Sequence, residues 1–425
     1  MVYGINYAPE PTGTGKYTAE MAEWLVRRGY EVDAIVAPPH YPSWKIDAAY
    51  TGKWWINESH NGVNVFRARL SVPKPDAVGA RGRIKMETTF SLSSLRYWIP
   101  RLLRRRRYDV VIGVCPPMQI GLLPYFYRAF RGVPWVFHIQ DFQVDAAIRL
   151  GVLDAGNVGS LLYKVENFFI RRASVVSTIT EPMRQRAIEK GAMDERTWLF
   201  PNWADITYIK PRSRLNTFRT NLGISESDTL LLYSGNFGKK QGLDLIVRAA
   251  DRLRDRKDLH FVVCGSGADA PRVQALAAEL DVPNLRFLPL QPWERVPDML
   301  AAADIHLVVQ RREAADLVMP SKLTNILAAG RPSIATADPG TALHQVLTDH
   351  EAGLMTPPEE LDPFVDAIQT LAADPALRDR MGRNARAYAE RYLDKEVILR
   401  DFEQKLINLV AETRKRGRKK KVAQS

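Results

Sequence analysis

The sequence predicts an α/β protein built from two doubly wound domains. Short apolar runs of strand length alternate with segments of helix length, which is typical of a parallel sheet with helices on both faces. This alternation occurs in two cycles, one on either side of residue 206. The chain has 425 residues, of which 46% are apolar, so it is long enough to form two hydrophobic cores.

The first cycle begins with a strand over Tyr3–Tyr7. A helix is predicted over Lys16–Arg28, because Tyr17, Met21 and Leu25 recur at a spacing that places them on one helical face. Further strands are predicted within 29–36 and at 110–114, 135–138 and 174–178.

The second cycle repeats this order, with strands predicted at 229–233, 259–264, 285–288, 305–309 and 333–336. The stretch 206–228 contains Pro211, several charges and no long apolar run, so we expect it to link the two domains. After Arg378 the pattern is helical to about Val410. Open parallel sheets bind ligands beyond the carboxyl ends of their strands, so we expect the functional residues there.

The two cysteines and the apolar runs indicate where the chain resides. Cys115 and Cys264 lie in or beside β-branched runs, so buried free thiols in a reducing cytoplasm are expected rather than a disulfide or a metal site. No secretory signal precedes Tyr3, and no run reaches the ~18 apolar residues of a membrane-spanning helix. We therefore expect a cytoplasmic protein.

Positive charge is concentrated in two parts of the chain. Residues 51–150 carry 16 Lys and Arg against 6 Asp and Glu, and residues 413–425 carry seven basic residues and no acid. The net charge of the whole chain is +12, so the remainder is slightly acidic. The tail 413–425 is expected to be disordered, and nucleic-acid binding is a second interpretation of its charge.

Within the first of these parts, the segment 81–107 combines apolar and basic side chains at helical spacing. Phe90 and Trp98 accompany several leucines, and the run Arg104–Arg107 ends the segment. This pattern predicts a basic amphipathic helix that docks on anionic lipid. The alternative is a helix that faces the core and has a solvated basic edge.

Residues 320–332 form the most informative stretch. Leu323, Ile326 and Leu327 predict the apolar face of a short helix, and Gly330 stands where a left-handed C-cap falls. Pro332 prevents continuation of the helix.

Ser321 and Lys322 stand at the start of this predicted helix. Ser321 is expected to cap it. Free backbone N–H groups, a hydroxyl and a positive charge at one point suit a diphosphate. The alternative is an ordinary capped helix with a surface lysine.

Glycine-rich loops follow the first strand of each cycle. Gly13 and Gly15 allow close approach of the backbone to an anion at a helix start, although a plain tight turn is the alternative. The spacing of a phosphate-loop nucleotide motif is absent. The second loop offers glycines, an amide and positive charge that suit a diphosphate: Gly235, Asn236, Lys239 and Lys240.

His138 ends a predicted strand shortly before Asp141. Its side chain shares a strand face with that of Gln140, because alternate residues point to the same side. A position at the carboxyl end of a strand favours a catalytic role, and a structural histidine is the alternative.

Five motifs in order resemble those of family 4 glycosyltransferases, and in particular the colanic-acid fucosyltransferase group within it. They are Tyr3–Glu10 with Thr12–Tyr17, His138–Asp141, Phe200–Trp203, Tyr233–Asn236 and Pro320–Gly330. With gaps, the resemblance extends from Tyr3 to about Leu406.

The resemblance implies the GT-B fold, in which two Rossmann-like domains face a cleft and a C-terminal helix crosses back onto the first domain. We therefore expect an acceptor-side domain at 1–205, which includes the membrane-facing basic segment, and a nucleotide-sugar donor domain at 206–385. The crossover helix is expected at 386–412, and the basic tail follows at 413–425.

The resemblance also implies the chemistry. The family transfers a sugar from a nucleotide sugar with retention, and it requires no metal or bound cofactor. The nearest relatives imply GDP-fucose as donor and a lipid-linked saccharide as acceptor, in exopolysaccharide assembly at the inner face of the cytoplasmic membrane. The expected partners are therefore the nucleotide sugar, the acceptor and an anionic membrane surface, without nucleic acid.

This chain departs from the family pattern at the donor sugar. The wider family has two glutamates eight residues apart, and here those positions hold Leu317 and Asn325. Asn325 can hydrogen-bond ribose hydroxyls, but without charge. Asp316 is the acid that we assign to the donor sugar as a catalytic residue, and Glu313 is the other nearby acid.

Two further departures concern the diphosphate and the catalytic histidine. The arginine and lysine of the family's diphosphate clamp correspond to Asn236 and Gln241, so Lys240 or Lys239 has to supply the charge. An alignment on Asp141 places Gln140, rather than His138, at the position of the catalytic histidine.

Two other classes of protein remain as alternatives. A GT-B sugar-nucleotide epimerase leaves the basic segment 81–107 without a role. A nucleic-acid-binding module explains the charge, but explains neither the paired α/β domains nor the helix that carries Lys322. Only two residues precede Tyr3 in what should be a central strand, whereas strands average ~5–6 residues, so we also expect the natural start to lie slightly upstream.

Overall fold

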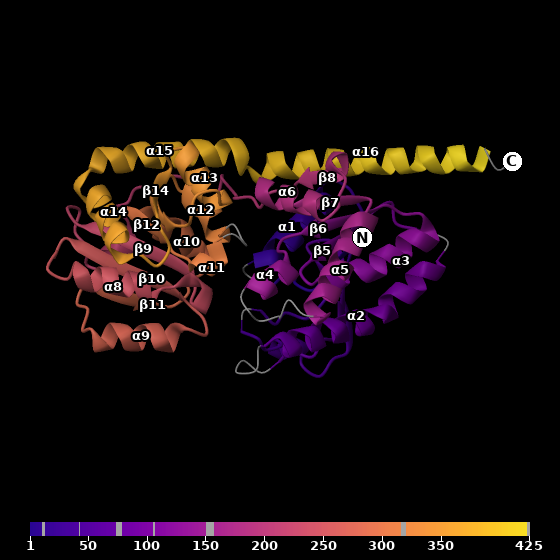
Figure 1. The fold of residues 1–425 in the computed structure, drawn as a ribbon, viewed down its shortest axis with the longest axis horizontal. Helices are drawn as coiled ribbons and strands as arrows, with labels where there is room; N and C mark the ends of the chain where they lie inside the picture. Colours follow the sequence, from indigo (N-terminus) through magenta and orange to yellow (C-terminus); the bar gives the residue numbers. More distant parts are fainter. Residues whose placement is uncertain are drawn as a thin grey trace. The chain divides into compact units, whose positions relative to one another are not determined.

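The computed structural model describes residues 1–10, 13–41, 43–73, 79–104, 107–149, 157–315 and 320–422 (Figure 1). The chain forms two compact units, one of Met1–Pro201 with Glu396–Ser425 and one of Asn202–Lys395. Each unit contains a sheet and surrounding helices, so the α/β class predicted from the alternation of apolar runs is confirmed.

The first unit contains an eight-stranded sheet in the order β3-β4-β2-β1-β5-β6-β7-β8. All pairings are parallel except that of β3 with β4, which are antiparallel. The strands are β1 (Val2–Gly4), β2 (Asp33–Val36), β3 (Trp55–His60), β4 (Val63–Ala68), β5 (Val111–Cys115), β6 (Trp135–Ile139), β7 (Val175–Thr178) and β8 (Thr197–Leu199). The helices are α1 (Gly13–Arg27), α2 (Ala80–Leu103), α3 (Leu122–Arg131), α4 (Gln143–Arg149), α5 (Asn157–Arg172), α6 (Glu181–Glu189) and α16 (Lys395–Val422).

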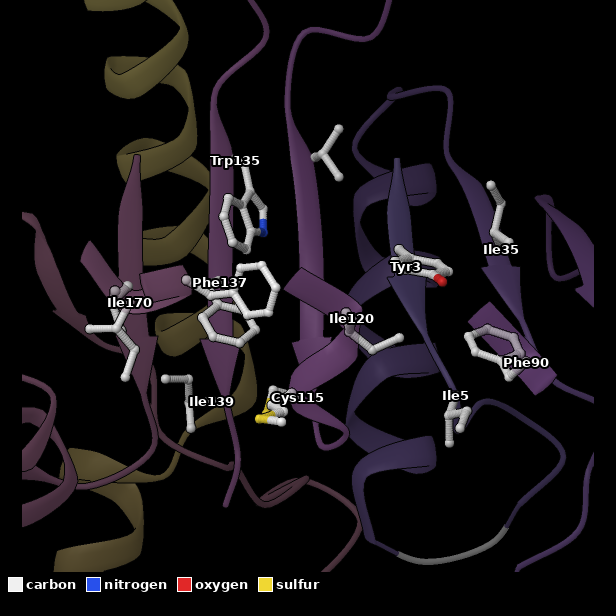
Figure 2. Close-up of a cluster of buried hydrophobic side chains, with 14 of the residues drawn as sticks. Tyr3, Ile5, Ile35, Phe90, Cys115, Ile120, Trp135, Phe137, Ile139 and Ile170 are labelled. Atoms are coloured by element: carbon white, nitrogen blue, oxygen red, sulfur yellow. The ribbon is translucent and has the colours of Figure 1, made fainter. Parts of the chain in front are cut away.

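Aromatic side chains fill the core of the first unit around its central strands (Figure 2). Tyr3 on β1 stacks on Phe90 of α2 with ring centroids 5.5 Å apart, and Trp135 and Phe137 lie together on β6. Cys115 belongs to the same cluster, and burial raises the pKa of its thiol. Both cysteines are buried and free, as their positions in β-branched runs predicted.

The helix predicted to dock on a membrane turns its large aromatic side chains inward. Phe90 and Trp98 of α2 are 0% and 1% exposed, and Trp98 lies edge-on to Tyr3 with ring centroids 5.1 Å apart. The prediction that these two side chains face lipid is therefore wrong, because α2 needs them to cover the apolar face of the sheet. Arg105 and Arg106 lie outside the described residues. No helix in the described part of the chain is long and apolar enough to cross a membrane.

The second unit contains a six-stranded, all-parallel sheet in the order β11-β10-β9-β12-β13-β14. Its strands are β9 (Thr229–Asn236), β10 (Leu259–Ser266), β11 (Leu285–Leu288), β12 (Ile305–Val308), β13 (Ser333–Thr336) and β14 (Gly353–Thr356). Its helices are α7 (Thr217–Asn221), α8 (Asp244–Arg252), α9 (Ala270–Glu279), α10 (Val296–Ala302), α11 (Arg312–Ala315), α12 (Ser321–Ala328), α13 (Ala342–Asp349), α14 (Leu361–Ala373) and α15 (Pro375–Tyr392).

The stretch 206–228 is part of the second unit and not a linker. Ile209 and Ile224 are buried in its core. Arg219 on α7 is also buried, where it pairs with Asp304 at 2.8 Å and donates to three backbone carbonyls. The linker prediction failed because widely spaced apolar residues, without a long run, are enough to anchor an irregular segment.

The C-terminal helix α16 covers part of the first unit. Phe402 stacks on Phe200 with centroids 3.8 Å apart, and the indole N–H of Trp24 donates to Glu396 at 3.0 Å. The helix continues to Val422, so the expectation of a disordered tail from residue 413 is not met. Lys and Arg favour helix, and extension of an existing helix avoids the cost of nucleation.

We predict that Phe90→Ala lowers the free energy of unfolding by about 3–5 kcal/mol, because a buried aromatic side chain leaves a cavity. Leu92→Ala is the matched control on the same helix, since Leu92 is 61% exposed and should change stability by less than about 0.5 kcal/mol. Urea unfolding of both variants measures the difference. Equal effects would contradict the inward orientation of this face of α2.

Candidate functional site

The backbones of β9 and β10 approach so closely at their carboxyl ends that only glycine fits at positions 265 and 267. Gly235 and Gly265 both have φ near 150°, and a Cβ atom on Gly265 would lie 1.8 Å from the carbonyl oxygen of Gly235. A Cβ atom on Gly267 would lie 2.4 Å from the carbonyl oxygen of Phe237. These glycines therefore fix the shape of the loop that follows β9.

Lys322 lies against this loop from the start of α12. Its Nζ is 3.6 Å from the centroid of the Tyr233 ring, and its Cδ would lie 3.6 Å from a Cβ atom placed on Gly235. Leu323 and Leu327 are fully buried and anchor α12 in the core. The sequence motifs include both Lys322 and Tyr233, but they assigned no role at the site to Tyr233.

The ammonium of Lys322 is buried and has no hydrogen-bond partner among the described residues. Burial lowers its pKa to about 7. An ammonium removed from water without a partner is costly, and a cation–π contact offsets only part of that cost. The arrangement therefore suits an anionic ligand that would supply the missing acceptors.

Three amide side chains around this edge of the sheet are also incomplete. Asn325 Oδ1 and Gln241 Oε1 are buried acceptors, and Gln310 Nε2 is a buried donor, each without a hydrogen-bond partner within the described ranges. Gln241 and Asn236 converge over Gly238, where a Cβ atom would meet both side chains at 3.0 Å or less. Buried polar groups usually have partners, so this set suits a polar ligand.

Lys239 and Lys240 are exposed in a short turn after the glycine loop. Arg311 fixes that turn, because its backbone N–H donates to the carbonyl of Lys240 at 2.8 Å and its Nε donates to that of Lys239 at 2.9 Å. Arg311 also pairs with Asp244 and Glu359. No motif or spacing in the sequence had singled out Arg311.

The structure bears differently on the predictions made for residues in and around α12. Helix α12 begins at Ser321 with Pro320 at the N-cap and no side-chain cap bond, so the prediction that Ser321 caps the helix is wrong. Gly330 has φ of 67° at the end of the helix, as its predicted left-handed position requires. Asp316 lies outside the described residues. Glu313, the alternative acid, is exposed on α11.

Gly13 and Gly15 lie in the first unit, at the start of α1. Gly13 has φ of 66°, and a Cβ atom on Gly15 would lie 2.8 Å from Glu10 Oε2. Glu10 is buried and accepts hydrogen bonds from the backbone N–H groups of His40 and Tyr41 and from the side chain of Asn6. Glu10 belongs to the motif Tyr3–Glu10, but the sequence assigned it no role, and its carboxylate lies so close to Gly15 that a side chain there would collide with it.

His138 is buried on β6 with both ring nitrogens engaged. The Gln140 amide N–H donates to Nε2 at 3.0 Å, so Nδ1 carries the proton and donates to Ser177 at 3.0 Å. Burial lowers the pKa of His138 to about 3, which keeps the ring neutral. In this geometry His138 positions Gln140.

Two family models match the chain in succession. The model described as Glycosyl transferase 4-like domain matches residues 12–203, and the model described as Glycosyl transferases group 1 matches residues 216–388. The protein WcaI of Escherichia coli (strain K12), whose name provisionally describes a colanic acid biosynthesis glycosyl transferase, is 38% identical over 412 residues. That match covers 95% of this chain and 98% of WcaI.

Solved structures with low sequence identity share the fold over nearly their whole length. Sucrose-phosphate synthase from Thermosynechococcus elongatus superimposes with a TM-score of 0.75 at 18% identity, covering 97% of this chain and 99% of that one. HepE of Anabaena, solved in complex with UDP, superimposes with a TM-score of 0.71 at 15% identity, and the match covers 96% of this chain and 99% of HepE.

These likenesses define a GT-B glycosyltransferase. The chain belongs to the family of group 1 glycosyltransferases with a 4-like first domain, and within that family it is similar to WcaI.

We predict that Lys322→Met stabilises the ligand-free protein, most strongly below pH 7. Folded Lys322 has a pKa of about 7, whereas an unfolded lysine has its ordinary pKa of 10.5. Between these values the parent gains up to about 1.4 kcal/mol of stability per pH unit as pH rises, and the advantage of the variant shrinks. Denaturant unfolding at pH 6 and pH 9 measures the change, with exposed Lys240→Met as control. An advantage independent of pH would contradict the buried charge.

Proposed function

We propose that this glycosyltransferase transfers fucose from GDP-fucose, with retention and without a metal ion, onto a lipid-linked saccharide in exopolysaccharide biosynthesis. The observation that carries the phosphate part of this proposal is the ammonium of Lys322 at the start of α12, which is buried and has no hydrogen-bond partner within the described parts of the chain. The donor and pathway are suggested by the likeness to WcaI, whose name refers to colanic acid.

Departure of the nucleotide leaves negative charge on a diphosphate. Lys322 and the free N–H groups of α12 would stabilise that charge from positions fixed before the reaction, which is the most effective use of electrostatics in catalysis. Lys239 or Lys240 would add charge from the turn held by Arg311. These cations would fill the role that a metal ion has in other transferases.

The incomplete amides would select the remainder of the donor. Asn325 Oδ1 can accept a hydrogen bond from a ribose hydroxyl, and Gln241 and Gln310 offer an acceptor and a donor nearby on the same edge of the sheet. Asp316 would contact the donor sugar. Gly13 and Gly15 in the first unit would contact the donor through their backbone.

The first unit would bind the acceptor. His138 holds the amide of Gln140 at the carboxyl end of β6, so we propose that it acts on the reaction through Gln140 rather than by proton transfer. Closure around both substrates would exclude water, which otherwise hydrolyses the donor.

We predict that GDP binds in the presence of a chelator and that Lys322→Ala weakens this binding by about 10- to 150-fold, since a hydrogen bond to a charged group contributes roughly 1.5–3 kcal/mol. Lys257→Ala, which removes an exposed lysine of the same unit, is the control. Titration calorimetry with GDP and with UDP measures both the contact and the base preference. Unchanged GDP affinity in Lys322→Ala would overturn the phosphate assignment, and tighter binding of UDP would overturn the guanine assignment.

Incubation with GDP-fucose and a membrane lipid extract then separates the enzyme classes. Transfer of label to lipid with retained anomeric configuration is the expected result. Isomerisation of the nucleotide sugar without an acceptor would instead identify an epimerase.

A further inference from the structure

Helix α3 of the first unit presents an apolar face to solvent. Leu122, Phe126 and Phe130 follow each other at intervals of four residues and are 41%, 43% and 73% exposed. Pro124 and Tyr127, on the other side of the helix, are buried. A row of exposed aromatic side chains on a soluble domain indicates an interaction surface.

Helix α5 extends this row. Phe126 stacks on Phe130 with ring centroids 6.4 Å apart. The ring centroid of Tyr125 lies 5.5 Å from that of Phe126 and 5.2 Å from that of Phe168 on α5. Leu161 and Phe168 are two turns apart on α5 and are also exposed. The aromatic side chains therefore form one continuous surface over two helices.

The end of α2 adjoins the same surface. Arg131 of α3 donates to the carbonyl of Arg104 at 2.5 Å, and Arg107 donates to the carbonyl of Arg131 at 3.0 Å. Leu103, which directly precedes Arg104, is 80% exposed. We call the exposed residues Leu122, Phe126 and Phe130 with Phe168 and Leu103 the α3 face.

The charged side chains exposed on the helices that form the α3 face have one sign. The sequences of α2, α3 and α5 contain two acidic residues, Glu87 and Glu166, and both are buried. The exposed charges on these helices, such as those of Lys164 and Arg172, are therefore all positive. Asp109, an exposed acid beyond the end of α2, is paired with Arg414 of α16.

We propose that the α3 face docks on an anionic lipid bilayer. Aromatic side chains that project from helices whose exposed charges are all positive match the boundary between anionic headgroups and acyl chains. A protein partner would ordinarily require polar groups of both signs around the apolar centre. The proposal rests on the proposed function in one respect, because a lipid-linked acceptor gives the enzyme a reason to reach the bilayer.

This surface replaces the one predicted from the sequence. Phe90 and Trp98 are core residues, whereas Phe126 and Phe130 lie in a segment whose ten residues contain only two charges. Basic residues of α16 lie close to it in the same unit, since a cavity of about 650 Å³ is lined by Arg128 together with Lys405 and Arg416. Two acidic residues, Glu195 and Glu412, line the same cavity, so basic residues outnumber acidic ones there. The bilayer would then meet basic residues contributed from far apart in the sequence.

The test is co-sedimentation with vesicles of phosphatidylcholine alone or with added phosphatidylglycerol. The parent should bind only the vesicles that contain phosphatidylglycerol, and less so as salt increases. Phe126→Ser combined with Phe130→Ser should reduce binding about tenfold or more. The control combines Leu215→Ser with Leu290→Ser, which removes two similarly exposed apolar side chains from the second unit and should leave binding unchanged.

Three results would overturn the proposal: equal binding by the parent and the Phe126/Phe130 variant, equal binding to neutral vesicles, or a dimer of the parent that the variant abolishes in sedimentation velocity. The last would assign the α3 face to a second copy of this chain. Far-ultraviolet circular dichroism and melting temperature establish that the variant is folded. The assay uses no donor or acceptor, so its failure and that of the transferase assignment are distinguishable.

Discussion

The chemistry of the second unit depends on one ammonium that the fold buries and leaves without a hydrogen-bond partner in the described structure. Lys322 lies over the Tyr233 ring and near Gly235, on a helix whose apolar side is held in the core. The helix cannot move the charge outward without exposing Leu323 and Leu327. A group retained at such a cost to stability is typical of a functional site, where a ligand completes what folding does not.

Two buried nitrogen bases, one in each unit, differ in their hydrogen-bond partners. Burial lowers the pKa of both Lys322 and His138. The histidine has a partner at each ring nitrogen and stays neutral, so it serves to order its neighbours. The lysine has no hydrogen-bond partner among the residues that the structure describes, and it remains responsive to an incoming anion. A low pKa by itself therefore does not distinguish a structural base from a functional one, whereas the hydrogen-bond partners do.

The sequence predicted the fold class well, because buried parallel strands appear as continuous apolar runs such as 229–233 and 259–264. It missed β3, whose alternating exposure makes no such run, although Asn61-Gly62 between β3 and β4 is a strong hairpin signal and both residues have positive φ. For the site, motif and spacing located Lys322 and Asn325. They could not show the roles of Arg311 and Glu10, which depend on contacts between residues distant in sequence. Helical periodicity could not show which side of α2 faces the sheet.

The return of α16 to the first unit has a consequence for the order of folding during synthesis. Residues 396–422 are synthesised after the whole of the second unit, yet Phe402 stacks on Phe200 and Glu396 accepts from Trp24, so the earlier unit is incomplete until they arrive. The second unit, whose residues are contiguous, is finished first. A chain released before residue 396 would thus carry an intact second unit beside a first unit with an uncovered apolar seam, a form suited to recognition by chaperones and proteases. Completion of the first unit therefore depends on synthesis of the chain beyond the second unit.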